Sequence, residues 1–244
     1  MTRRLNEEGR GSADESHALD ADGRYRGLDV ILHRVEAGGE SIELFGLRDA
    51  ADLLDEADFG ARFLEEDVAP YGMELWPAAT MLARYVAARS HSIADSGPKK
   101  RMLEIGAGLG LISILAARLG WDVTASDHEP ASLAFARRNA AHNGVSLQVT
   151  HLDWHKPPTG LRFPVIVASD VLYELRDHAG LISCLKTCLS PDGEAWIADP
   201  NRGVADRFET LAVSHGFGVK VESSRAINRG GEPVAGRIFV LRRG

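Results

Sequence analysis

Glu104-Ile105-Gly106-Ala107-Gly108-Leu109-Gly110 follows a short apolar strand that the sequence predicts over Met102–Ile105. Alternating glycines let the backbone approach a ligand closely, and the apolar helix expected over Leu111–Leu119 offers free N–H groups at its start. The glycine spacing differs from the Gly-x-Gly-x-x-Gly pattern that binds dinucleotides. Glu104 suits a cationic amine, reached through ordered water, and would repel a pyrophosphate. The stretch therefore predicts a strand–turn–helix unit that binds an amine-bearing ligand.

Strands and helices alternate after this stretch. The expected strands are Asp122–Ser126, Leu147–Leu152, Pro164–Ser169 and Ala195–Ala198, and the expected helices are Pro130–Asn143, Leu175–Leu189 and Val204–His215, with a turn at Pro191-Asp192-Gly193. This alternation predicts an α/β fold with a parallel sheet and right-handed crossovers. The last two expected strands, Gly218–Glu222 and Arg237–Leu241, have only a short glycine-rich connection. They should therefore form an antiparallel hairpin at one edge of the sheet.

The N-terminal part of the chain has a different pattern. Residues 1–27 contain few apolar side chains, so we expect a disordered tail. Two short strands, Leu28–His33 and Ser41–Leu47, flank a turn over residues 36–40, and an amphipathic helix is expected over Trp76–Ala88. Between them runs an acidic stretch, residues 49–67. We expect residues 28–97 to form an extension that covers the ligand site as a lid, and residues 98–244 to form the main domain.

Polar and aromatic side chains mark the ends of the expected strands. They are Asp127 with His128, Asp153 with Trp154, and Asp170 with Tyr173. Ligands of parallel sheets bind at the carboxyl ends of the strands, near the switch in strand order. A carboxylate at Asp127 can hold both hydroxyls of a ribose, and an indole at Trp154 can cover an adenine. Asp170 and Tyr173 would place a carboxylate and a phenol at the centre of the crevice, although an aspartate here can also cap the next helix.

Composition and charge argue against a nucleic-acid-binding, membrane-spanning or secreted protein. The 244 residues are 44% hydrophobic and 26% charged, and the formal net charge is −7, which lacks the basic footprint of a nucleic-acid-binding chain. No apolar run approaches the ~18 residues that a membrane span needs, and no apolar segment follows Met1–Arg4 as in a secretory signal. Cys184 and Cys188 lie four residues apart in an expected helix, where a disulfide is awkward, so we expect reduced, partly buried thiols. We expect a cytoplasmic monomer without nucleic-acid or membrane partners.

Glu104–Gly110, Asp127 and Asp153 together resemble the class I, seven-stranded methyltransferases that use S-adenosylmethionine. The resemblance covers about residues 100–244 and implies a Rossmann-like, doubly wound sheet of seven strands, mostly parallel, with a C-terminal antiparallel hairpin. Residues 71–79, Tyr-Gly-Met-Glu-Leu-Trp-Pro-Ala-Ala, resemble the segment that precedes this fold in the family-16 protein-lysine methyltransferases. Leu152–Trp154 and Asp170–Tyr173 also resemble that branch.

The resemblance assigns roles to individual residues. Trp76 would contact the cofactor, Gly106–Gly108 would pass its methionine part, and Ser169 would line the sulfonium end with Asp170. Tyr173 would lie at the amine entrance. The candidate cofactor-binding residues are Trp76, Glu104, Gly106, Ala107, Gly108, Gly110, Asp127, His128, Asp153, Trp154 and Ser169, the candidate catalytic residues are Asp170 and Tyr173, and no metal ligand is expected.

These observations favour an S-adenosylmethionine-dependent N-methyltransferase that acts on a protein lysine. A small-molecule amine, such as a nicotinamide-like ring, is an open alternative, as is a non-catalytic cofactor-binding module. A nucleobase amine is disfavoured because Val171 and Leu172 stand where base-modifying enzymes carry two prolines. A metal-dependent O-methyltransferase is disfavoured because Pro200 separates Asp199 from Asn201. A nicotinamide-dependent oxidoreductase is disfavoured by Glu104 and the glycine spacing.

Overall fold

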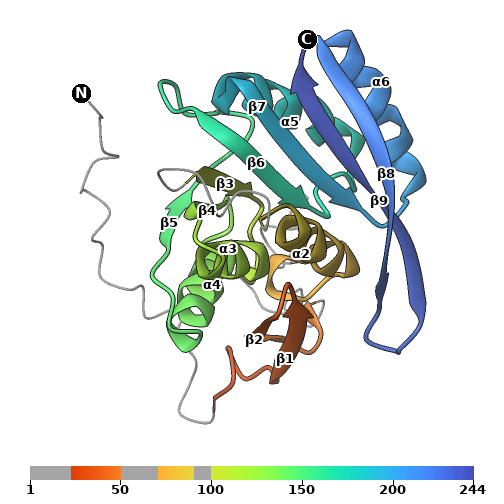
Figure 1. Cartoon of the computed structure of the whole chain (residues 1–244). Coiled ribbons are helices and arrows are strands. Elements are labelled where there is room, and N and C mark those ends of the chain that lie inside the picture. Colours follow the sequence, from red (N-terminus) through yellow and green to blue (C-terminus); the bar gives the residue numbers. More distant parts are fainter. Residues whose placement is uncertain (1–22, 51–70, 91–99) are drawn as a thin grey trace.

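The computed structural model describes residues 23–50, 71–90 and 100–244 (Figure 1). The predicted tail lies almost wholly outside these ranges. So do most of the acidic stretch and the connector before residue 100.

The described elements follow the expected order along the chain. They are β1 (Val30–Ala37), β2 (Glu40–Leu47), η4 (Tyr71–Met73), α2 (Pro77–Ser90), β3 (Arg101–Ile105), α3 (Leu111–Arg118), β4 (Asp122–Asp127), α4 (Pro130–His142), β5 (Gln148–His151), β6 (Phe163–Ser169), α5 (Leu175–Cys188), β7 (Leu189–Asp199), η5 (Gly203–Ala205), α6 (Asp206–Ser214), β8 (Phe217–Ile227) and β9 (Pro233–Arg243).

Seven of the strands form one sheet in the order β5-β4-β3-β6-β7-β9-β8. Strand β3 pairs in parallel with β4 on one side and with β6 on the other, so the strand order switches beside the glycine-rich turn that follows β3. Strand β9 is antiparallel to both β7 and β8. The predicted Rossmann-like sheet with its C-terminal hairpin is confirmed, and its topology places the carboxyl ends of β3, β4 and β6 together.

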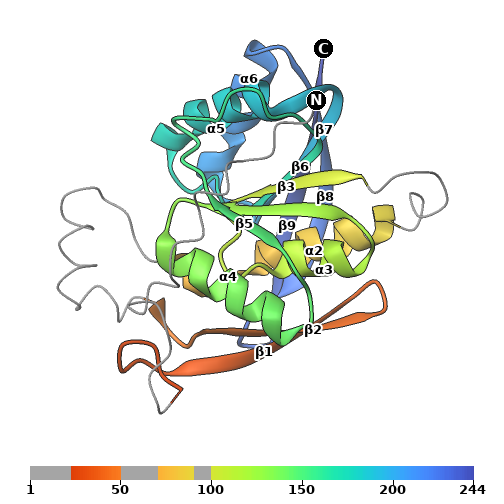
Figure 2. The same cartoon turned by 90° about the vertical axis from the view of Figure 1, so that its left-hand side faces the viewer.

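Helices cover both faces of this sheet. Figure 2 shows α5 and α6 on one side and α2, α3 and α4 on the other. One apolar cluster lies under α2, α3 and α4, and a second lies under α5 and α6. None of the helices in the described ranges is long and apolar enough to cross a membrane.

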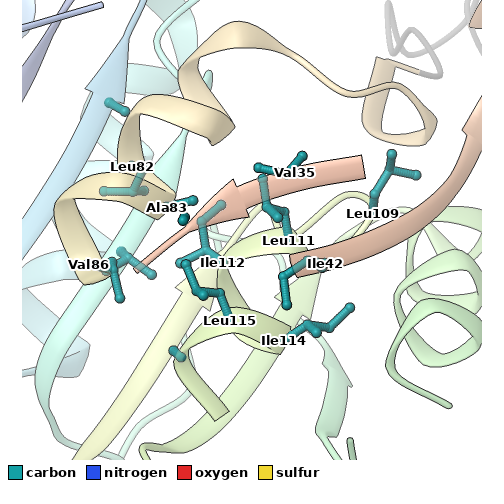
Figure 3. Packing of buried hydrophobic residues seen from close by; sticks show 14 of the residues in the cluster. Val35, Ile42, Leu82, Ala83, Val86, Leu109, Leu111, Ile112, Ile114 and Leu115 are labelled. Carbon is teal, nitrogen blue, oxygen red and sulfur yellow. The ribbon is translucent and has the colours of Figure 1, made fainter. Parts of the chain in front are cut away.

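The β1–β2 hairpin packs outside the layer of α2, α3 and α4. Its turn is only Gly38-Gly39, both at positive φ, which is tighter than the five-residue turn that the sequence predicts. A Cβ on Gly38 would lie 2.6 Å from the Cβ of Ala87 in α2, so the turn needs glycine there. Val35 and Ile42 of the hairpin meet the apolar side chains of α2 and α3 (Figure 3). The hairpin is therefore part of the main core.

Asn139 of α4 and Asn143, the residue that follows this helix, bind β2 along the edge opposite β1. Asn139 accepts a hydrogen bond from the Phe45 N–H at 2.8 Å and donates one to the Phe45 carbonyl at 3.0 Å. Asn143 makes the same pair of bonds with Glu43, at 3.1 and 2.6 Å. Their spacing of one helical turn matches the spacing of alternate residues on a strand. The two side-chain amides thus make the hydrogen bonds that the backbone of a neighbouring strand would otherwise make with this edge of β2.

Three expectations about the C-terminal half are corrected. The turn expected at residues 191–193 lies inside a strand: β7 runs through them, and its pairing with β6 jumps from Leu189 to Glu194. Strands β8 and β9 are each 11 residues long, about twice the predicted length. Cys184 and Cys188 are free thiols, but they are fully rather than partly buried in α5.

Candidate functional site

A pocket of about 380 Å³ opens at the carboxyl ends of β3, β4 and β6. Its lining comes from the glycine-rich turn, from the strand ends, and from the segment just before α2. Ten of the predicted site residues lie on it: Trp76, Gly106, Ala107, Gly108, Asp127, His128, Trp154, Ser169, Asp170 and Tyr173.

The glycine-rich turn lies against the segment before α2. Gly106 and Gly108 adopt positive φ values of 67° and 52°. A Cβ on Gly108 would lie 2.7 Å from the carbonyl oxygen of Gly72, and a Cβ on Gly106 would lie 2.9 Å from Val171. Glycine is therefore required by conformation and by space, and the pocket floor is bare backbone.

Asp127 fixes this turn from the end of β4. Its carboxylate accepts hydrogen bonds from the Gly108 N–H and the Glu129 N–H, each at 2.9 Å. Burial raises the pKa of Asp127 above its usual range, and His128 and the two N–H donors oppose that shift. A carboxylate has about four acceptor sites, so Asp127 can hold the turn and also accept from a ligand hydroxyl. The side chain that caps α4 is Glu129 rather than Asp127.

Glu104 lies beneath the pocket rather than on its lining. One carboxylate oxygen accepts from the Ser113 N–H at 2.9 Å and from the Ser113 hydroxyl, whereas the other oxygen is buried with no hydrogen-bond partner. Burial raises the pKa of Glu104 to about 8. This carboxyl is thus poised to gain from a cationic group that enters above it.

Trp154 forms one wall of the pocket. Its side chain is buried, and its ring lies 6.1 Å from that of His128 between centroids. Asp153 beside it points elsewhere and accepts from the His155 N–H at 2.8 Å. Gly110 also lies off the lining, because it precedes α3 and packs against Ala136. The predicted binding roles of Glu104, Gly110 and Asp153 stay predictions, and none of these residues lies on the lining.

Aromatic rings gather at the other end of the pocket. Tyr71 makes edge-to-face contacts with Trp76 and Tyr173, with centroid distances of 5.9 and 6.2 Å. The Trp76 indole N–H donates to the Tyr71 carbonyl at 2.8 Å, which fixes the indole. Burial, with nearby acids, raises the pKa of Tyr173 to about 12, so its hydroxyl stays protonated at neutral pH.

Asp170 lies beside these rings in a left-handed conformation, with φ 62°. Its N–H donates to the Ala198 carbonyl at 2.9 Å. One carboxylate oxygen forms an ion pair with Arg202, and the other is buried with no hydrogen-bond partner. Non-glycine residues adopt such a φ at a cost of about 1–3 kcal/mol, which the surrounding structure must offset.

A second hollow of about 720 Å³ adjoins the pocket. It lies between the β1–β2 hairpin and the tip of the β8–β9 hairpin, and the two cavities share Glu74, Trp76, Asp170 and Arg202 in their linings. The two cavities therefore meet at Asp170 and Arg202.

Sequence reasoning missed several lining residues, among them Gly72, Ser132 and Arg202. The Ser132 hydroxyl is buried and without a hydrogen-bond partner. Arg202 pairs with Asp170, and Arg229 lies 3.6 Å from Glu74. The segment 71–79 carried a signal for Gly72, whereas no local pattern marked Ser132 or Arg202.

The pocket fits S-adenosylmethionine. Its volume is in the range of small-molecule sites. The bare glycine turn suits the methionine part, the buried Asp127 carboxylate suits ribose hydroxyls, and the indole wall of Trp154 suits an adenine. The orphaned oxygen of Glu104 below the turn suits the cationic amine.

Curated proteins with similar sequences are methyltransferases. The histone-arginine methyltransferase METTL23 of Xenopus laevis is 36% identical over 135 residues, which cover 52% of this chain and 56% of the relative. The protein-lysine methyltransferase METTL21E of Bos taurus is 34% identical over 162 residues, which cover 58% and 53%. The chain thus spans about half the length of these relatives.

Solved structures share the fold at low sequence identity. A protein from a study of thioacetal formation during echinomycin biosynthesis has a TM-score of 0.57 at 18% identity, over 75% of this chain and 92% of that one. PH1948 of Pyrococcus horikoshii, described as a candidate RNA methyltransferase, has a TM-score of 0.53 at 16% identity, over 66% and 83%.

A family model adds the decisive match. It is described as lysine methyltransferase and matches residues 57–209, more than half of the chain. These residues include the segment before α2, the glycine-rich turn, and Asp127, Trp154 and Asp170. The chain therefore belongs to the lysine methyltransferase family of class I methyltransferases, and S-adenosylmethionine is its cofactor.

Proposed function

We propose that this protein transfers a methyl group from S-adenosylmethionine to a nitrogen of a protein side chain, with lysine as the first candidate. The observation that carries the proposal is that the Asp170 carboxylate and the rings of Tyr71, Trp76 and Tyr173 line the same pocket. Aromatic faces attract an amine that arrives as a cation, and a carboxylate oxygen can accept a hydrogen bond from its nitrogen.

The acceptor class rests on two further observations. The second hollow leads from the protein surface to Asp170 and is large enough for part of a polypeptide. The matched relatives are named for transfer to protein lysine and to histone arginine. A protein side chain is therefore favoured over a free metabolite, and arginine is the second candidate.

The cofactor would lie with its methionine part along Gly106–Gly108, its ribose at Asp127 and its adenine at Trp154. When bound, it supplies a methyl group on a positively charged sulfur, which leaves as a neutral thioether as the new N–C bond forms. In this scheme, Ser169 and Asp170 line the sulfonium end. The chain's task is then alignment and exclusion of water rather than strong acid–base chemistry.

The acceptor must present a lone pair, so a lysine ammonium must first lose its proton to water. Its ordinary pKa is about 10.4. Loss of hydration on entry into the pocket favours the neutral amine. The Tyr173 hydroxyl, with its pKa near 12, can then orient that amine by a hydrogen bond without itself ionising.

Labelling tests the proposal. Purified protein is incubated with tritiated S-adenosylmethionine and a native lysate, beside an Asp170→Ala, Tyr173→Phe double variant. A Tyr85→Phe, Asp192→Ala variant carries the same substitutions away from the pocket and serves as the matched control. We expect discrete labelled protein bands with the wild type and the control, lost with the pocket variant.

Acid hydrolysis of the labelled band then identifies the acceptor. Methyl-lysine supports the first candidate, and methyl-arginine replaces it with the second. Label confined to the small-molecule fraction would overturn the protein acceptor in favour of a metabolite amine. Cofactor binding without any label would overturn catalysis and favour the non-catalytic module.

A further inference from the structure

Arg202 stands where the two hollows meet. It follows β7 in the loop that carries Asp199, and its guanidinium forms the ion pair with Asp170. The same nitrogen lies 3.8 Å from the carboxylate of Asp199, which is fully buried. Arg202 lines both cavities, and about a third of its side chain is exposed.

Two backbone hydrogen bonds and the conformation of the preceding residue hold Arg202 in this place. The Arg202 N–H donates to Asp199 at 2.9 Å, and its carbonyl accepts from Arg237 of β9 at 3.0 Å. Asn201, just before it, has a left-handed conformation with φ 59°. The left-handed backbone of Asn201 and the two hydrogen bonds of the Arg202 backbone hold the Arg202 side chain beside Asp170.

Several charged side chains around this junction form ion pairs. Among the described residues that line or support it, Glu74 pairs with Arg229 at 3.6 Å, Asp199 with Arg237 at 3.4 Å, and Asp170 with Arg202. The titratable side chains that also line the two hollows near it are Tyr71, Tyr173, His33, Arg34, Glu36 and Arg84, and Arg237 pairs with Asp206 as well. Burial raises the pKa of Tyr173 to about 12, and burial with Arg229 lowers the pKa of His33 to about 4, so both are neutral at pH 7. Removal of Arg202 alone would therefore leave one unbalanced negative charge next to the acceptor position.

The ion pair between Asp170 and Arg202 affects whether the acceptor amine can be methylated. A bare carboxylate beside the acceptor would stabilise the ammonium, which has no lone pair and cannot be methylated. We propose that Arg202 is a positioning residue that neutralises Asp170, so that one carboxylate oxygen can orient the acceptor nitrogen without holding its proton. The proposal deepens the proposed function and rests on it for the identity of the acceptor.

The first test needs only the cofactor pocket. Sinefungin carries a primary amine, protonated at neutral pH, where S-adenosylmethionine carries its methylated sulfur, and S-adenosylhomocysteine is uncharged there. Calorimetry gives the dissociation constants of both ligands for the wild type and for three variants. Two are the single variants Arg202→Gln and Arg202→Lys, and the third is a double variant that combines Asp170→Asn with Arg202→Gln.

We expect Arg202→Gln to tighten sinefungin relative to S-adenosylhomocysteine by about tenfold, because an unbalanced carboxylate attracts the amine. Arg202→Lys keeps the charge and should stay within about twofold of the wild type, and Asp170→Asn should cancel the effect of Arg202→Gln. An unchanged ratio, or an equal change for both ligands, would overturn the proposal. Unaltered S-adenosylhomocysteine binding shows that the variant is folded.

The second test uses the labelled acceptor. In Arg202→Gln, the acidic limb of the kcat/KM profile should move to higher pH, and Arg202→Lys should restore it, whereas a purely structural loss would lower the profile without moving it. The two proposals fail separately. A shifted ligand ratio without labelled protein overturns the acceptor class, and labelled protein with an unmoved ratio overturns the role of Arg202.

Discussion

At the scale of single residues, Gly108 shows how closely two distant segments approach at the pocket floor. Gly108→Ala would strain the left-handed backbone, at about 1–2 kcal/mol, and would push against the Gly72 carbonyl 2.7 Å away. We expect it to weaken S-adenosylhomocysteine binding more than tenfold in calorimetry. Gly120→Ala is the matched control, because Gly120 also has positive φ but has nothing within 4 Å of an added Cβ. Equal binding losses in both variants would contradict the prediction.

Glu104 makes stability depend on pH. Its folded pKa of about 8 lies above the value of about 4.3 in an unfolded chain, so the folded protein keeps a proton that the unfolded chain has lost. The resulting stabilisation is complete below about pH 4 and is lost as pH rises through about 8. We expect the wild type to lose on the order of 3–5 kcal/mol relative to Glu104→Gln between about pH 5 and pH 9.

Urea denaturation of both proteins at several pH values measures this difference, and the comparison cancels every other titrating group. A difference in unfolding free energy that is constant with pH would contradict the raised pKa of Glu104.

Residue positions were predictable where a local pattern fixed them. Asp127 reaches the pocket as the last residue of β4, Asp170 directly follows β6, and Trp154 lies three residues after β5. The sequence marks the end of each of these strands. Arg202 could not be found in this way. It meets Asp170 across 32 residues of sequence, through a loop whose path depends on the pairing of β7 with β9.

At the scale of elements, Asn139 joins the β1–β2 hairpin to the pocket. Besides its two bonds to Phe45, it donates to the Leu109 carbonyl in the glycine-rich turn at 3.0 Å. Asn139→Ala would leave these buried groups unpaired, so we expect a loss of about 2–4 kcal/mol and weaker S-adenosylhomocysteine binding. Asn143→Ala removes bonds to β2 without touching the turn and should leave binding unchanged. Equal effects on binding would contradict this link.

Element boundaries followed the strength of the local signals. Asn143-Gly144 ended α4 within one residue of the expected position, whereas β1 runs four residues beyond the expected end at His33, up to Gly38-Gly39. The true lengths of β8 and β9 were hidden, because residues 224–227 and 233–236 pair only with each other, beyond the end of β7. Strand pairing rather than composition extends these two strands.

At the scale of the whole molecule, the hairpin, α2 and the sheet share one apolar cluster, which includes Ile42, Val86, Ile112 and Val240. We therefore expect a single unfolding transition, with coincident curves from tryptophan fluorescence and far-UV circular dichroism. S-adenosylhomocysteine at 100 times its dissociation constant should add about 2.7 kcal/mol and raise the Tm by roughly 5–10 °C. Two separate transitions would instead favour an independent lid over residues 28–97.

The reactivity of the two cysteines can report local opening of the protein. Cys184 and Cys188 are the only cysteines of the chain, and both are fully buried on the inner side of α5. A water-borne thiol reagent can reach them only when α5 leaves the sheet. The rate of thiol modification under native conditions therefore measures how often α5 leaves the sheet, on the side away from the β1–β2 hairpin. The measurement needs no added label or engineered residue.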